Sequence, residues 1–164
     1  DGGLELVYDV CHNIAKVEDH NVHGKSCKCC VHRKGATRAL GGDHSELAAR
    51  FSAVGQPVLV PGDMGTASWV LAGPKEGGND AFSSSCHGAG RRLSRTAARK
   101  LIDSDELRAR LEASGIHVRA KTPNVLAEEA PDAYKDVDEV IRLSASANLA
   151  RPVARLRPFA VIKG

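Results

Sequence analysis

The sequence predicts a mixed α/β (α+β) fold, made of strands with several surface helices. Hydrophobic residues make up 42% of the 164 residues and charged residues 26%, a composition typical of a chain that folds around a buried core. Short apolar runs bounded by glycine and proline indicate strands, and other segments carry apolar residues at helical spacing. The length predicts a single domain, or part of one, over residues 1–164.

The beginning of the chain is predicted to be strand and loop. Residues 4–10 alternate enough to form a strand, which would place the triplet Cys11-His12-Asn13 at a strand end. The polar residues 20–28 are typical of a loop. Residues 30–34 resemble a short strand that enters a turn at Gly35. A site at the strand end is therefore expected.

The next segments alternate between short regular elements and turns. Residues 46–51 resemble one or two helical turns. Two apolar runs, residues 56–60 and 67–72, predict strands, and residues 61–66 between them predict a tight connection. Residues 73–79 contain three glycines and predict a flexible loop.

Helices are expected mainly in the second half. The glycine- and serine-rich residues 83–90 do not favour a helix, whereas residues 92–102 carry apolar side chains at helical spacing. His87 would then stand just before a helix start. Ser104 is predicted to cap a further helix that ends before Gly115.

The last part of the chain is predicted to combine two strands with one helix. Residues 116–120 predict a strand, and Asp136 with Glu139 resembles a capping box that opens a helix. Residues 153–162 predict a terminal strand, in which Pro158 would impose an edge position or a bulge.

Lysine and arginine are concentrated in three segments around glycine-rich turns, although the net charge is only +3. This distribution indicates a phosphate-bearing partner, and a set of ordinary solvated faces is the alternative that charge alone leaves open. Aromatic residues make up only 4% of the chain, which argues against a surface that stacks bases. The basic segments contain Lys28, Arg33, Lys34 and Arg38; Arg91, Arg92, Arg95, Arg99 and Lys100; and Arg151, Arg155, Arg157 and Lys163.

Composition also bounds the location of the protein. Charged residues interrupt every apolar run, so none reaches the roughly 18 residues of a membrane-spanning helix, and we expect no membrane contact. The five cysteines are odd in number and irregularly spaced, which disfavours a disulfide framework and favours the cytoplasm. The first residue is Asp1 and the only methionine is Met64, so we expect the chain to be part of a longer protein.

The most informative local feature is His87, which lies in the segment Ser-Cys-His-Gly-Ala-Gly. The glycines leave backbone N–H groups free to bind an anion, and a helix start just after them would add positive charge. On that helix Arg91 and Arg95 would lie one turn apart. An imidazole beside a phosphate serves as a nucleophile or as a base. A structural or surface histidine is the alternative.

Three other motifs leave their alternatives open. The glycine turn of residues 61–68 lacks the Gly-Lys-Ser/Thr of a Walker A loop, so an ordinary hairpin turn is the simpler interpretation. His12 is either a metal ligand or a core histidine. Zinc binding by Cys27, Cys29 and Cys30 is disfavoured because the paired C-x-x-C spacing is missing.

Six motifs in order along the chain resemble the C-terminal portion of the RtcB family of RNA-splicing ligases, whose front portion is absent here. They cover nearly the whole chain, and each is weak by itself. The motifs are Cys11–Ala15, Val31–Arg38, Pro61–Ser68, Cys86–Arg91, Glu129–Val137 and Val161–Gly164.

The resemblance implies a GTP- and manganese-dependent RNA ligase. Such an enzyme joins RNA 3′-phosphate or 2′,3′-cyclic phosphate ends to 5′-hydroxyl ends through a histidine–GMP intermediate, in tRNA splicing or RNA repair. The implied cofactors are GTP and two Mn²⁺ ions in the complete protein. The implied partners are RNA (tRNA halves or broken RNA), the missing N-terminal part of the ligase and an archease-type activator. A non-catalytic RNA- or phosphate-binding module is the alternative.

The resemblance also assigns roles to individual residues. His87 matches the histidine that attacks GTP, and His12 matches a manganese ligand. Because most manganese ligands lie in the absent front portion, we expect the isolated chain to be inactive. Lys34, Arg91 and Arg95 match contacts to RNA phosphates. The matched nucleotide contacts are Asn13, Pro61, Gly62, Asp63, Met64, Ser68, Gly88, Ala89, Gly90, Tyr134 and Lys163.

Overall fold

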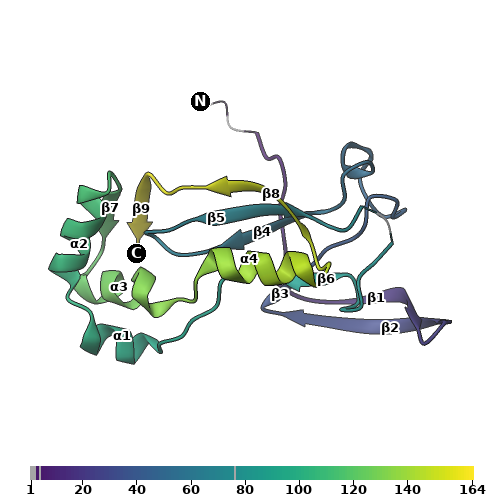
Figure 1. Ribbon diagram of the computed structural model, residues 1–164, viewed down its shortest axis with the longest axis horizontal. Helices are drawn as coiled ribbons and strands as arrows, with labels where there is room; N and C mark the ends of the chain where they lie inside the picture. The colour runs from purple at the N-terminus through teal and green to yellow at the C-terminus, as the bar shows by residue number, and fades with distance from the viewer. Residues whose placement is uncertain (1–2, 4, 76) are drawn as a thin grey trace. The chain divides into compact units, whose positions relative to one another are not determined.

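A computed structural model describes residue 3 and residues 5–75 and 77–164, and it confirms the α+β class (Figure 1). Over this part the strands are β1 (Asn13–Val22), β2 (Lys25–Lys34), β3 (Ala36–Arg38), β4 (Pro57–Pro61), β5 (Ser68–Ala72), β6 (Ser84–Cys86), β7 (His117–Ala120), β8 (Arg151–Leu156) and β9 (Ala160–Lys163). The helices are α1 (Arg95–Leu101), α2 (Ser104–Ala113), α3 (Pro123–Glu128) and α4 (Val137–Ser146), with short 3₁₀ turns η1 (Ala49–Phe51) and η2 (Pro131–Ala133).

The chain forms two compact units. Unit 1 comprises Asp1–Leu59, Leu71–His87 and Ser144–Pro152, and unit 2 comprises Val60–Val70, Gly88–Leu143 and Val153–Gly164. The strands pair into sheets of order β1-β2, β3-β6, β4-β5-β8 and β7-β9. The candidate site residues therefore fall into two groups, one in each unit.

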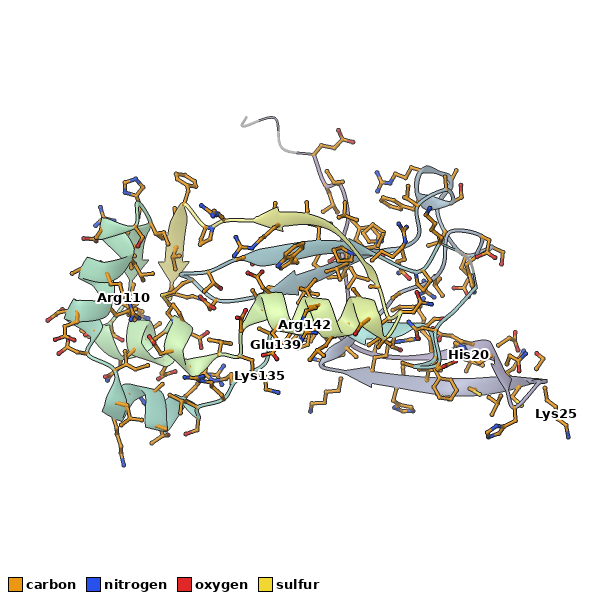
Figure 2. All side chains as sticks on the ribbon, viewed as in Figure 1. His20, Lys25, Arg110, Lys135, Glu139 and Arg142 are labelled. Carbon is orange, nitrogen blue, oxygen red and sulfur yellow. The ribbon has the colours of Figure 1, made fainter. Side chains whose placement is uncertain are left out.

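A long antiparallel hairpin of β1 and β2 dominates unit 1, so the loop predicted for residues 20–28 is wrong. His23 and Gly24 form its two-residue turn with φ of 51° and 80°, the positive values that such hairpin turns require. Figure 2 shows Lys25 at the tip and His20 further along β1. One face of an antiparallel ribbon can remain solvated, so polar residues that favour a loop in the sequence occupy exposed strand positions instead.

The segment before the hairpin also differs from its prediction. The strand expected over residues 4–10 is wrong, because residues 5–11 have no regular secondary structure, and Leu4 lies outside the described residues. None of the sheets in the described part of the chain includes this segment. β1 begins at Asn13 instead, so His12 stands before a strand and not after one. An alternating pattern makes a strand only where a neighbouring strand supplies hydrogen bonds.

A buried ion pair connects the hairpin to β6 inside unit 1. The guanidinium of Arg33 donates to both carboxylate oxygens of Glu18 at 2.9 and 2.7 Å, and its Nε donates to Ser84 Oγ at 2.9 Å. The side chains of Arg33 and Glu18 are only 1% and 6% exposed. Burial by itself raises the pKa of Glu18, but hydrogen bonds from Arg33 and His20 hold it below its ordinary value. The Glu18 carboxylate is therefore ionised in the folded protein.

The middle of the chain follows its prediction closely. β4 and β5 confirm the strands expected at residues 56–60 and 67–72, with a short connection between them. The helical turn expected over residues 46–51 is confined to η1. Residues 73–75 and 77–79 have no regular helix or strand, and Glu76 lies outside the described residues.

The core of unit 2 packs helices against a parallel strand pair. Leu107 and Leu111, one helical turn apart on α2, are buried with Val118 of β7, Leu126 of α3 and Val161 of β9. β7 and β9 pair in parallel, and Figure 1 shows α2 and α3 beside them. This packing fixes the end of β9, which carries Lys163.

Helix boundaries in unit 2 correct three predictions. The helix expected over residues 92–102 begins only at Arg95, because Ser94 caps it by accepting a hydrogen bond from the Ala97 amide at 3.1 Å. His87 therefore does not precede a helix start, and Arg91 lies outside the helix. Asp103, rather than Ser104, caps α2 by accepting from the next two amides.

The C-terminal elements combine a confirmed strand and helix with two corrections. β7 and α4 confirm the elements expected at residues 116–120 and after Asp136, whose carboxylate accepts hydrogen bonds from the first turn of α4. The single strand expected over residues 153–162 is broken around Pro158 into β8 and β9. The sequence analysis also missed α3, which Thr122 caps. Among the described residues no helix has the length and apolar composition needed to cross a membrane.

Candidate functional site

Two histidines stack on one another in unit 1. The rings of His12 and His87 lie nearly parallel, with their centroids 4.3 Å apart and their planes inclined by 5°. The antiparallel pairing of β3 with β6 sets Ala36 opposite Cys86, so Gly35 and His87, the adjacent residues, also face each other. The Gly35 amide donates to the carbonyl oxygen of His12 at 3.0 Å, which completes the cluster.

Gly35 gives His87 its close backbone neighbour. Its φ of 70° is a left-handed value that favours glycine. A Cβ atom added there would lie 3.6 Å from Cδ2 and 3.7 Å from Nε2 of His87. Burial, and then the neighbouring charge of His12, lower the pKa of His87 below its ordinary value of 6.5. The ring is therefore neutral near pH 7.

Two further predicted site residues lie at the base of the hairpin. Asn13 and Lys34 are cross-strand partners, and they are adjacent in sequence to His12 and Gly35 respectively. Both are exposed. Lys34 has no ion-pair partner in the described part of the chain, so its ammonium is open to an anionic ligand. The structure thus brings together His12, Asn13, Lys34 and His87 within unit 1.

The structure also shows whether potential metal ligands are gathered into a site. Across residues 3, 5–75 and 77–164 no group of three His, Cys, Asp or Glu side chains is arranged to hold a metal ion. The zinc alternative based on Cys27, Cys29 and Cys30 is therefore wrong, and all three are free thiols. The residues present do not build a manganese site by themselves, since His12 offers a single imidazole.

The glycine turn of unit 2 packs against the segment that follows His87. The Ala89 amide donates to the carbonyl oxygen of Pro61 at 3.1 Å. Ser68 Oγ accepts a hydrogen bond from the Gly62 amide at 3.4 Å. A Cβ added at Gly62 would come within 2.0 Å of the Ala67 carbonyl oxygen, so only glycine fits there. Four predicted nucleotide contacts, Pro61, Gly62, Ser68 and Ala89, therefore lie together.

The carboxylate of Asp63 organises the turn itself. Its Oδ1 accepts from the amides of Gly65 and Thr66 at 2.8 and 2.9 Å, and its Oδ2 accepts from the Thr66 hydroxyl at 2.7 Å. This is an Asx turn, in which a side chain satisfies the backbone of its own loop. The carboxylate is therefore already engaged within the turn.

Two sequence-based expectations about this region change. The side chain of Met64 is buried in the hydrophobic core of unit 2, so a ligand would meet only its backbone. The predicted anion site in residues 87–90 required free backbone amides next to the start of a helix. The helix begins only at Arg95, so it does not start next to these residues. Gly90 does adopt a left-handed φ of 76°, and its carbonyl oxygen accepts from the Lys135 amide at 3.0 Å. The Ala89 amide is already bonded to Pro61. One of the amides expected to bind an anion is therefore already engaged.

A second polar cluster of unit 2 surrounds Glu129. The Tyr134 hydroxyl donates to Glu129 Oε2, and Lys163 Nζ lies 3.9 Å from the same oxygen. Arg91 Nη1 lies 3.3 Å from Glu129 Oε1, and Arg95 Nε lies 3.5 Å from it. Burial by itself raises the pKa of Glu129, but the Tyr134 hydroxyl and the neighbouring cations hold it below its ordinary value. Burial and the bond to Glu129 raise the pKa of Tyr134. We name these five residues the Glu129 cluster.

The arginines predicted to contact RNA phosphates are engaged inside unit 2. Arg91 donates to the carbonyl oxygens of Leu93 and Glu128 at 3.0 and 2.6 Å, and its guanidinium lies over the Tyr134 ring, 4.8 Å from the centroid. Arg95 pairs with Glu128 as well as with Glu129. Their contacts to RNA stay predictions, and only Lys34 of the three is unpaired among the described residues.

Sequence reasoning missed three residues that shape these clusters. Gly35 was predicted only as a turn residue, and nothing in the sequence indicates that it lies beside His87. Arg33 was counted with the basic segments, although it is buried against Glu18. Glu129 lies within a motif quoted for the resemblance and carried no assigned role. No local sequence pattern indicates the role of Glu129, because the cations that it pairs with, Arg91, Arg95 and Lys163, are more than 30 residues away in the sequence.

The whole sequence matches one family of known proteins. The family described as tRNA-splicing ligase RtcB matches residues 1–164. The tRNA-splicing ligase RtcB of Pyrococcus furiosus is 54% identical over 164 residues, which are 100% of this chain and 17% of the relative. That of Archaeoglobus fulgidus is 51% identical over 164 residues, 100% of this chain and 34% of the relative. The RNA-splicing ligase RtcB of Mycobacterium tuberculosis is 55% identical over 161 residues, 98% of this chain and 37% of the relative. The chain spans well under half the length of these relatives.

Proposed function

Because the chain belongs to the tRNA-splicing ligase RtcB family, we propose that it is the part of an RNA ligase that carries the covalent histidine–nucleotide intermediate. The complete protein would join an RNA 3′-phosphate or 2′,3′-cyclic phosphate end to a 5′-hydroxyl end with GTP as the co-substrate. Broken RNA or tRNA halves would be its substrates in the cytoplasm. The rest of the ligase and an archease-type activator would be its partners.

His87 is the proposed nucleophile. A neutral ring nitrogen gives its lone pair to the α-phosphorus of GTP, forming a P–N bond, while the bond from that phosphorus to the bridging oxygen breaks and pyrophosphate leaves. An oxygen of the RNA 3′-phosphate then attacks the same phosphorus, and the P–N bond breaks. Finally the 5′-hydroxyl oxygen attacks the activated 3′-phosphate, loses its proton, and displaces GMP.

The observation that carries the proposal is the state of the His87 ring. Its side chain has no hydrogen bond or ion pair with any residue in the described part of the chain, so its nitrogen lone pair is uncommitted. A histidine that is merely structural is more commonly held by hydrogen bonds when partly buried. The stacked ring of His12 and the backbone of Gly35 hold the imidazole in place by packing alone.

The proposed nucleotide contacts are the residues that the resemblance assigned. They include Asn13, the turn of Pro61–Ser68, Tyr134 and Lys163. His12 is proposed as a manganese ligand of the complete protein. A divalent ion bound there would neutralise negative charge on the triphosphate.

Labelling with GTP that is radioactive at the α-phosphate tests the proposal. We expect the complete protein to retain the label after denaturing electrophoresis, and we expect His87→Ala to abolish it. His32→Ala is the matched control, because His32 is an exposed histidine of the same unit whose side chain, among the described residues, hydrogen-bonds only Cys30 Sγ, at 3.5 Å. Retention of label by His87→Ala would refute the assignment. RNA binding without any adduct in the unaltered protein would support the non-catalytic module instead.

A further inference from the structure

Glu129 joins side chains that the proposed function assigns to the nucleotide, yet it has no assigned role of its own. Its carboxylate meets the Tyr134 hydroxyl on Oε2 and the Lys163 ammonium at 3.9 Å from the same oxygen. Its other oxygen meets Arg91 at 3.3 Å. Four side chains of unit 2, including Arg95, converge on one acidic group. Removing that group would take an anchoring contact from each of them, and the only ion-pair partner among the described residues from Lys163.

The backbone around Lys163 is fixed, whereas its side chain depends on Glu129. β9 pairs with β7 so that Lys163 stands opposite Ala120, and the Lys163 carbonyl oxygen accepts from the Lys121 amide at 2.8 Å. Beyond the backbone, the ammonium has one ion-pair partner among the described residues, which is Glu129. The Lys163 side chain is 36% exposed and that of Glu129 only 19%. The carboxylate therefore directs an ammonium that remains open to a ligand.

The ring of Tyr134 is oriented by the same group. A hydrogen bond to Glu129 fixes the hydroxyl, and the Arg91 guanidinium, itself held by Glu129, covers one face of the ring. A base that stacks on Tyr134 would have to use the other face. Because the partly buried Glu129 carboxylate already orients the ring, less side-chain entropy is lost when a ligand binds.

We propose that Glu129 is a positioning residue that pre-organises Lys163 and Tyr134 for the nucleotide. This inference rests on the proposed function, because it takes both residues as nucleotide contacts. Glu129 does not touch the reacting phosphorus in this scheme, so its loss should weaken nucleotide binding and leave the covalent step at saturation unchanged. Its effect should also depend on the presence of Lys163.

The first measurement is the GTP dependence of adduct formation in the complete protein. Glu129→Gln keeps an acceptor for Tyr134 and removes the charge, so we expect the GTP concentration for half-maximal labelling to rise about five- to tenfold with the maximal rate unchanged. Glu128→Gln is the matched control. Glu128 is the neighbouring carboxylate and pairs with Arg95 and Arg99, without a contact to Lys163 or Tyr134. It should leave both parameters unchanged.

The second measurement separates positioning from general damage to the fold. In a Lys163→Met background the additional change Glu129→Gln should raise the half-maximal GTP concentration less than twofold, because its partner is already absent. Equal effects in both backgrounds would overturn the inference. An unchanged half-maximal concentration in a folded Glu129→Gln protein would do so as well.

Equilibrium dialysis with GTP in a His87→Ala background keeps the two proposals distinguishable. GTP binding there needs no adduct, so Glu129→Gln should still weaken it about five- to tenfold even if His87 proves not to be the nucleophile. If His87→Ala binds GTP and Glu129→Gln does not change the affinity, the positioning role is refuted. If the complete protein binds no GTP at all, the inference fails together with the nucleotide assignment.

Discussion

The two compact units hold their candidate site residues with charge networks of different burial. In unit 1 the Arg33–Glu18 pair is almost fully buried, and among the described residues it forms no hydrogen bond or ion pair with His12 or His87. In unit 2 the Glu129 cluster is partly exposed and contains the candidate site residues themselves. The first network therefore serves the fold beneath the site, and the second is part of the site.

This difference matches the chemistry proposed for each group. A nucleophile needs an uncommitted lone pair, so His87 is held by ring stacking and a close backbone, without hydrogen bonds. Groups that bind a nucleotide gain from being held in place before binding, so Tyr134 and Lys163 are tied to a carboxylate. Three substitutions test the contrast between the units.

The largest effect is expected from Arg33→Ala in unit 1. It would leave Glu18 buried without its main partner, and breaking a buried pair in this way costs about 3–5 kcal/mol. Hydrogen–deuterium exchange should show that β1 and β2 open far more readily in the variant. Arg155→Ala in unit 2 is the comparison, because Arg155 and Asp138 form an exposed pair at 2.9 Å. That pair is expected to contribute below about 1 kcal/mol. If the two variants lose equal protection from hydrogen–deuterium exchange, the buried pair does not stabilise the fold more than the exposed pair.

A smaller effect is expected from Gly35→Ala beside the histidine pair. The left-handed backbone should cost a non-glycine residue about 1–2 kcal/mol, and the new methyl group would cover the Nε2 edge of His87. We expect slower labelling by GTP at saturation. Gly24→Ala is a close control, since its φ of 80° imposes the same strain and an added Cβ meets no atom within 4 Å. Similar rates for both variants would show that this edge of the ring is not used.

The smallest effect is expected in the turn of unit 2. Asp63→Ala removes three hydrogen bonds from a partly exposed loop, and each net contribution is only about 1 kcal/mol or less. Faster amide exchange of Gly65 and Thr66 and weaker GTP binding should follow. Asp63→Asn keeps an oxygen that can accept from both amides, and should change GTP binding less than Asp63→Ala. If Asp63→Asn weakens GTP binding more than Asp63→Ala, the negative charge of Asp63 acts on the ligand directly and not by holding the turn.

Local patterns predicted the elements that local chemistry stabilises. β4 and β5 lie where apolar runs end at glycine or proline, and α2 ends at Ala113, two residues before Gly115, whose φ is 80°. The hairpin escaped prediction because the charged residues Glu18 and Arg33 are buried while Val17 is exposed, so the strands lack the apolar-in, polar-out alternation that an antiparallel ribbon with one solvated face usually shows. The misplaced start of α1 arose because helical spacing extends one turn beyond the cap at Ser94.

The candidate site divides in the same way. The sequence identified His12, His87, Tyr134 and Lys163 as candidates. It did not indicate that His12 stacks on His87, or that Glu129 contacts Tyr134 and Lys163. His12 and His87 stack although they are 75 residues apart in the sequence, and no spacing rule relates them. Arg91 and Arg95 have the composition of a phosphate-binding run, yet the fold places carboxylates against them.

The family, the α+β class and the candidate side chains could be predicted before any coordinates were known. Which charges are neutralised, and that the His87 imidazole forms no hydrogen bond among the described residues, became clear only from the folded chain. Caps, turns and periodicity act over a few residues, whereas ion pairs and ring contacts join groups that folding brings together from distant positions.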